Sequence, residues 1–109
     1  MKTFGEHLKE ARKEKKITQR ELGKMIGVDF TYISKIETGA LEPPSEEVIK
    51  KISRELDLDE NELFLAAKKV PTEFKNTIIE NSTANMFFRK YPNLTDEQLK
   101  MIKEIIEEE

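Results

Sequence analysis

The chain has 109 residues, of which 38% are charged, and this length suits one small domain or a small domain with an appendage. With no cysteine and only one histidine, it offers no disulfide framework and no zinc or acid–base cluster, so we expect no metal, no cofactor and no enzymatic activity. No stretch approaches the roughly 20 apolar residues of a membrane helix, and the N-terminus lacks the apolar run of a secretion signal. We therefore expect a cytoplasmic protein with no membrane partner.

The formal net charge of −3 conceals an uneven distribution of charge along the chain. Residues 1–40 hold nine Lys or Arg against six Asp or Glu, a net charge of +3. Residues 41–69 and residues 70–109 each hold five basic against eight acidic side chains, a net charge of −3 for each segment. Positive charge is concentrated in the first 40 residues, where it favours contact with the phosphates of a nucleic acid.

An opening helix is predicted from Phe4 to about Lys15, because Phe4, Leu8 and Ala11 are spaced for one helical face. The basic residues between positions 9 and 16 would lie on its exposed side. Such a run is typical of a solvated surface that can also touch phosphate, and we expect it to take no part in sequence recognition.

A second helix begins after Thr18, which forms a capping-box pattern with Glu21. Gly23 leaves room for another helix to approach, and Gly27 can adopt the left-handed conformation that ends the helix and turns the chain. The buried stripe at positions i, i+3 and i+4 is expected to comprise Leu22, Met25 and Ile26.

A third helix follows this turn, with Asp29 as its predicted N-cap. Ile33 and Ile36 would bury one face, so the opposite face must point outward. The outward residues are Phe30, Thr31, Ser34 and Lys35. A short exposed helix carried on a second helix has the dimensions of a rod that fits the major groove of DNA.

Two more helices are expected before residue 70. Ser45 caps the fourth helix after a double proline, and Asp59 caps the fifth, on which Leu63 and Phe64 lie inside. The buried positions of the fourth helix are Val48, Ile49, Ile52 and Leu56. We predict an all-α fold in which five short helices share one core.

These residues resemble the Xre/Cro-like helix-turn-helix domain of phage repressors and small bacterial regulators over about residues 4–70. The matching segments are Thr-Gln-x-Glu-Leu-Gly-x-x-Ile-Gly-Val from Thr18, Ile33-Ser-Lys-Ile-Glu-Thr-Gly39, Pro44-Ser-Glu-Glu-Val-Ile-Lys-Lys-Ile52, Leu56-Asp-Leu58 and Leu63-Phe64. The resemblance implies a five-helix, lambda-repressor-like DNA-binding domain, which we place at residues 1–69. It also implies that Arg12 and Glu37 form a structural ion pair that fixes the pose of the third helix.

Exposed residues of such a domain would make two kinds of contact with a double-stranded operator. Base edges are assigned to Phe30, Thr31, Ser34 and Lys35, because an aromatic edge or a threonine methyl can touch a thymine methyl and lysine can donate to guanine. Phosphate contacts are assigned to Gln19, Tyr32, Thr38 and Gly39. An alternative for Phe30 is a partly buried packing residue. Phe30 also departs from many relatives of the resembled family, which have a polar residue at this position.

The spacing of apolar residues over positions 70–109 predicts short, strongly apolar helices that form a C-terminal dimerisation or regulatory region. Pro71 would open the first, the second would run from Ser82 to Tyr91, and Thr95 would cap the last with Gln98. The residues assigned to the dimer interface are Phe74, Ile78, Phe87, Phe88, Tyr91, Leu99, Ile102 and Ile106. These faces either fold back on the first domain or pack against a second copy, which we favour. The last residues, 107–109, are acidic and should fray.

The sequence therefore predicts a homodimeric transcriptional repressor that reads the major groove of a pseudo-palindromic operator. An alternative is an antitoxin, or a repressor inactivated by a peptidase, whose C-terminal helices bind a toxin or a regulatory peptidase. A toxin gene or a zinc-peptidase gene beside this one would favour the alternative. An enzyme is the weakest hypothesis, because no nucleophile, carboxylate pair or metal set is present.

Overall fold

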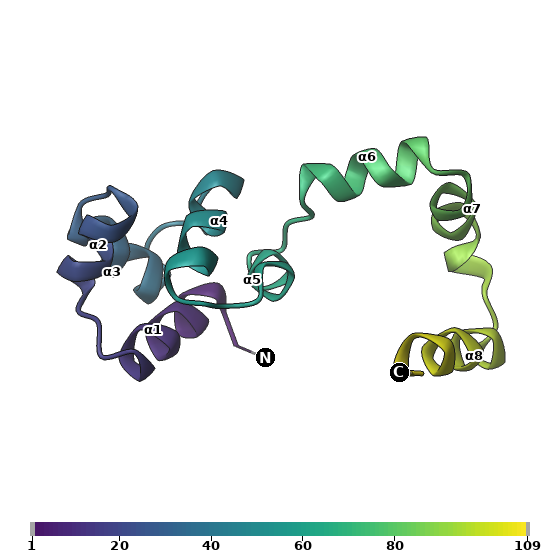
Figure 1. Ribbon diagram of the computed structural model, residues 1–109, viewed down its shortest axis with the longest axis horizontal. Helices are drawn as coiled ribbons and strands as arrows, with labels where there is room; N and C mark the ends of the chain where they lie inside the picture. The colour runs from purple at the N-terminus through teal and green to yellow at the C-terminus, as the bar shows by residue number, and fades with distance from the viewer. Residues whose placement is uncertain (1, 109) are drawn as a thin grey trace. The chain divides into compact units, whose positions relative to one another are not determined.

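The structure is a computed structural model that describes residues 2–108, and within that range every regular element is helical (Figure 1). The α-helices are α1 (Phe4–Glu14), α2 (Gln19–Ile26), α3 (Phe30–Thr38), α4 (Glu46–Glu55), α5 (Glu60–Ala66), α6 (Thr72–Glu80), α7 (Ser82–Lys90) and α8 (Asp96–Glu107). The predicted all-α fold is confirmed. The chain divides into two compact units, the first ending at Pro71 and the second beginning at Thr72.

The first unit packs α1 to α5 around one hydrophobic core. Helix α3 packs against both α1 and α2, α4 packs against α2 and α5, and α5 returns to α1 (Figure 1). The largest side chains with less than 2% exposure are Leu8, Leu22, Ile33, Ile49, Ile52, Leu56 and Phe64. Each such side chain contributes about 1.5–3 kcal/mol by leaving water, so this core holds the short helices in place.

Two glycines let α1 and α2 approach the segment that contains α3. A Cβ atom on Gly5 would lie 2.5 Å from the carbonyl oxygen of Ile36, and one on Gly23 would lie 2.7 Å from that of Val28. Neither contact leaves room for a methyl group. Glycine at these positions therefore sets the distance between α3 and the two helices that carry it.

Met25 was expected to share the buried stripe of α2, and this prediction is wrong, because 40% of its surface is exposed. Leu22 and Ile26 are buried as expected. The reason is that Gly23 also faces inward, towards the turn before α3. The buried arc of α2 is therefore centred between Leu22 and Gly23, and Met25 falls at its edge.

Side-chain caps define most of the helix starts. Capping boxes are present at Thr3 with Glu6, Thr18 with Glu21, and Thr95 with Gln98. Single side-chain caps are provided by Asp29, Ser45, Asp59 and Asn81. The predicted caps of α2 to α5 and α8 are thus confirmed, and because each cap satisfies an N–H group at a helix end, these short helices have fixed ends.

The second unit has no residue in the buried class among those described. Helix α6 packs against α7, which leads into a short 3₁₀ turn from Tyr91 to Asn93. Helix α8 extends to Glu107, with Glu108 as its C-cap, and Glu109 lies outside the described residues. Over residues 2–108, no helix is long and apolar enough to span a bilayer.

Candidate nucleic-acid interface

The interface is built on α3, which has one buried and one outward face. Ile33 and Ile36 are 1% and 3% exposed and fix the helix to the core. At about 100° per residue, the four residues assigned to base edges fall within an arc of about 140° on the other side. Of these four, Thr31 and Lys35 are exposed and Phe30 and Ser34 are half-buried.

Asp29 holds the first turn of α3 and also restricts Thr31. The Asp29 carboxylate accepts hydrogen bonds from the backbone N–H of Thr31 at 2.8 Å and from its hydroxyl at 2.7 Å. Because the Thr31 hydroxyl donates its hydrogen to Asp29, Thr31 offers a binding partner its methyl group and a lone pair of its oxygen. The bonds from Thr31 lower the pKa of Asp29, so this cap is ionised at neutral pH.

The other end of α3 is closed by a glycine in the left-handed region, Gly39 at φ 82°. The backbone N–H of Leu41 and the hydroxyl of Thr38 both donate to the carbonyl oxygen of Lys35, each at 3.2 Å. Thr38 and Gly39 are exposed, whereas Tyr32 is half-buried and packs its ring against the core. The structure thus leaves Thr38 and Gly39 accessible to a partner, and Tyr32 less so.

Arg12 and Glu37 form a bidentate ion pair between α1 and α3. Arg12 Nε and Nη2 donate to the Glu37 carboxylate at 2.7 and 2.9 Å, and Arg12 Nη1 donates to the carbonyl oxygen of Ile17 at 2.9 Å. The side chains are 10% and 3% exposed. The hydrogen bonds to Glu37 raise the pKa of Arg12 further, so the guanidinium stays charged.

Gln19 extends this network to α2, because its side-chain amide donates to Glu37 at 3.2 Å. Three helices therefore meet at one carboxylate. The sequence assigned Gln19 to a phosphate and Glu37 to the ion pair, but it did not indicate that the two side chains touch. The contact orients the Gln19 amide at the first residue of α2, where backbone N–H groups and the helix dipole favour an anion.

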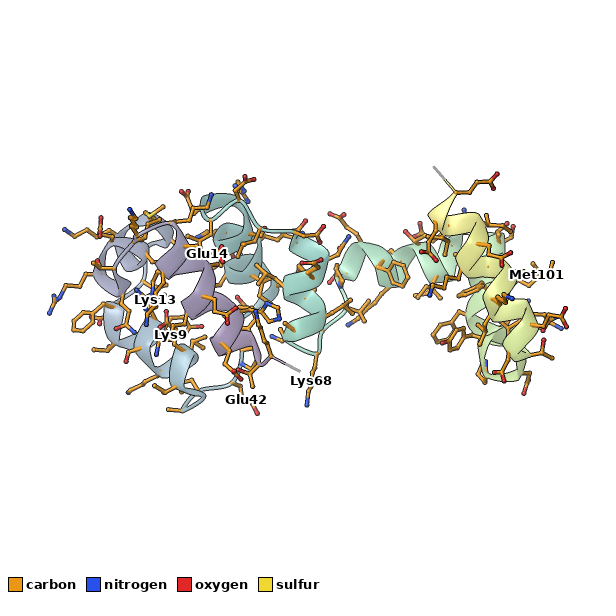
Figure 2. All side chains as sticks on the ribbon, turned by 90° about the horizontal axis from the view of Figure 1, so that it is seen from below. Lys9, Lys13, Glu14, Glu42, Lys68 and Met101 are labelled. Atoms are coloured by element: carbon orange, nitrogen blue, oxygen red, sulfur yellow. The ribbon has the colours of Figure 1, made fainter. Side chains whose placement is uncertain are left out.

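Arg20 was not among the residues assigned to DNA contacts from the sequence. Its guanidinium carbon lies 4.0 Å from the centre of the Phe30 ring, within the range of a cation–π contact. The aromatic residue at the start of α3 was a signal for such a partner, but nothing in the spacing of the two residues indicates that they meet. The basic residues Lys9 and Lys13 of α1 are also exposed (Figure 2).

A family model of the helix-turn-helix matches residues 8–63, about half of the chain. The HTH-type transcriptional repressor RghR of Bacillus subtilis (strain 168) is 32% identical over 92 residues, which cover 77% of this chain and 68% of RghR. The chain spans 44% of the length of another HTH-type regulator that it matches.

Two solved structures share the fold. The P22 c2 repressor in complex with a synthetic operator has a TM-score of 0.53 at 35% identity, over 58% of this chain and 94% of that chain. A SinR–SinI protein complex has a TM-score of 0.54 at 25% identity, over 84% of this chain and 92% of that chain. With α2, the glycine turn and α3 in place, these matches show that the chain belongs to the Xre/lambda-repressor-like helix-turn-helix family.

Proposed function

We propose that this protein is a homodimeric transcriptional repressor that places α3 in the major groove of a pseudo-palindromic operator. The observation that carries the proposal is the outward face of α3, whose pose is fixed by the shared carboxylate of Glu37. The P22 c2 repressor, which is similar over 58% of this chain, was solved with a synthetic operator. A helix held this rigidly can present its side chains to base edges without first being ordered.

In this proposal the two sets of exposed residues have different effects on binding. Lys35 donates to a guanine, whereas Gln19 contacts a phosphate, which carries affinity but no sequence information. Phe30, Thr31 and Ser34 complete the base contacts, and Tyr32, Thr38 and Gly39 complete the phosphate contacts.

The division of roles is tested by titrating two variants against the selected operator and against a random duplex. Lys35→Ala should weaken operator binding by about 1–3 kcal/mol and random binding much less, because it removes a base contact. Gln19→Ala should weaken binding to the operator and to the random duplex by a similar factor. The assignment is contradicted if Lys35→Ala weakens binding to the two duplexes equally, or if Gln19→Ala changes the preferred sequence.

The second unit is proposed as the dimer interface. Its helices enclose an apolar groove of about 1040 Å³, lined by residues of α6, α7 and α8. Phe74, Phe87 and Phe88 in this lining are 56%, 44% and 61% exposed, which is unusual for aromatic side chains of a finished core. A second copy would cover these faces, and a two-fold dimer would also place two α3 helices about 34–36 Å apart, one turn of DNA.

Two neighbouring isoleucines of α8 supply a matched test of this interface. Ile106 lines the groove and is 71% exposed, whereas Ile105 is 68% exposed and does not line it. Ile106→Ser should shift the sedimentation of the full chain towards the monomer and lower operator affinity, and Ile105→Ser should change neither. If both variants dimerise like the original chain, the groove is not the interface.

A protein partner is the second candidate for the groove. The similar SinR protein was solved with SinI, and that likeness covers 84% of this chain. If the full chain sediments as a monomer but represses in cells, an antitoxin or peptidase-sensitive repressor becomes the better proposal.

A further inference from the structure

We propose that Arg20 and Phe30 form one unit that recognises a thymine–guanine step. In this arrangement the Arg20 guanidinium donates to O6 and N7 of the guanine, and the Phe30 ring edge touches the methyl group of the neighbouring thymine. The inference rests on the proposed DNA binding by α3. It gives the interface a base contact from α2, a helix whose assigned contact was a phosphate.

The first support is the contact itself. The Arg20 guanidinium carbon lies 4.0 Å from the centre of the Phe30 ring, and this contact joins the first turn of α2 to the first residue of α3. A guanidinium carries five N–H donors in a planar fork, and no hydrogen bond among residues 2–108 uses them. The ring therefore limits the orientations of a long side chain while its donors stay available.

The second support is the set of bonds that Arg20 does not make. Among residues 2–108, no hydrogen bond and no ion pair uses its guanidinium. Arg20 also interacts electrostatically with Asp29, one carboxylate oxygen of which accepts from the N–H and the hydroxyl of Thr31. Arg20 is thus a cation that lies against an aromatic ring at the start of α3 and keeps its hydrogen-bond donors.

The third support concerns Phe30, which has no hydrogen-bonding group and cannot read a base edge as a polar residue would. It can contact a thymine methyl, and it can orient a planar donor beside it. A guanine next to that thymine offers two acceptors to a forked donor. A phosphate also accepts a bidentate arginine, so what favours the base is the position of Arg20 beside Phe30, a residue assigned to base edges.

The experiment begins with selection of bound fragments from random duplexes by the 109-residue protein. The selection is repeated with Arg20→Ala, which removes the guanidinium, and with Phe30→Leu, which keeps an apolar side chain but removes the ring. Lys24→Ala is the matched control, because it removes one exposed positive charge from the same helix. Far-UV circular dichroism checks that each variant is folded.

We expect Arg20→Ala to lose the preference for one guanine in each half-site by about 5- to 150-fold. Phe30→Leu should weaken the preference for the same guanine and for the adjacent thymine, and Lys24→Ala should weaken binding without changing the motif. If Arg20→Ala recovers the original motif, Arg20 makes no base contact and the inference is overturned while the proposed function stands. If the original protein enriches no motif at all, the proposed function fails first.

Discussion

Replacing Glu37 by Gln changes one heavy atom and removes one charge at the point where α1, α2 and α3 meet. Glu37 accepts two hydrogen bonds from Arg12 and one from Gln19. A glutamine has only one acceptor oxygen, so its NH₂ group must face another donor. Arg12 then remains largely buried without its counter-charge.

The expected loss of stability follows from these contacts. Hydrogen bonds to charged groups contribute about 1.5–3 kcal/mol each, and breaking a buried ion pair by changing one partner costs about 3–5 kcal/mol. Arg12 keeps its bond to Ile17, and its side chain is still 10% exposed. We therefore expect the lower end of that range, about 3 kcal/mol, for Glu37→Gln.

The assay is urea unfolding followed by tyrosine fluorescence. The chain has two tyrosines and no tryptophan, and Tyr32 lies on α3 while Tyr91 lies in the second unit. In a Tyr91→Phe background, Tyr32 reports the first unit alone. A loss of about 3 kcal/mol would lower the midpoint by about 1–3 M urea.

A double variant with methionine at positions 12 and 37 provides the control, because replacing both charges by apolar groups often restores stability. The urea midpoint of this double variant should return most of the way to that of the original chain. Operator binding should not recover, since Gln19 still lacks its partner. A Glu37→Gln midpoint that corresponds to a loss of less than about 1 kcal/mol would refute the role given to the pair.

Three further outcomes follow from local geometry. Gly5→Ala should destabilise the first unit by about 1–3 kcal/mol in the same assay, since its Cβ would lie 2.5 Å from a backbone oxygen of α3; an unchanged midpoint contradicts the close packing. Leu22→Ala should cost about 2–5 kcal/mol, and Met25→Ala far less, because only Leu22 is fully buried. The bonds from Thr18 lower the pKa of Glu21 below its ordinary 4.5, so its cap stabilises the fold above that pH and is lost as pH falls through the lowered value. Glu21→Gln keeps the capping box, as Gln98 does in α8, but removes the titrating carboxylate. Its free energy of unfolding should fall less below pH 4.5 than that of the original chain, and an equal fall in both argues against this contribution.

Local rules explain what the sequence predicted well. The caps Thr18 and Asp29 and the turn at Gly27 depend on residues close in the chain, and the structure has all three. Met25 was misplaced because periodicity gives the width of a buried stripe but not its centre, which the packing partner decides.

The contacts that organise the interface are of a different kind. The Gln19–Glu37 bond and the Arg20–Phe30 stack join residues 18 and 10 positions apart on different helices. No periodicity links such pairs, since they depend on the angle at which two helices cross. The Arg12–Glu37 pair was expected only through resemblance to a family, and the structure contains it with two hydrogen bonds.

A net charge of −3 is compatible with DNA binding because most acidic side chains near the interface already accept a hydrogen bond or form an ion pair within the fold. The carboxylates of Glu6, Glu21 and Asp29 accept backbone N–H groups at helix starts, and Glu37 is held by Arg12. Their fields are therefore partly cancelled where they arise, and charges beyond about 8 Å are screened at physiological salt. The exposed basic residues of the first 40 positions include Lys9, Lys13, Arg20, Lys24 and Lys35. The fold thus holds Glu37 in an ion pair and leaves these bases exposed, which favours contact with phosphate despite the net negative charge of the chain.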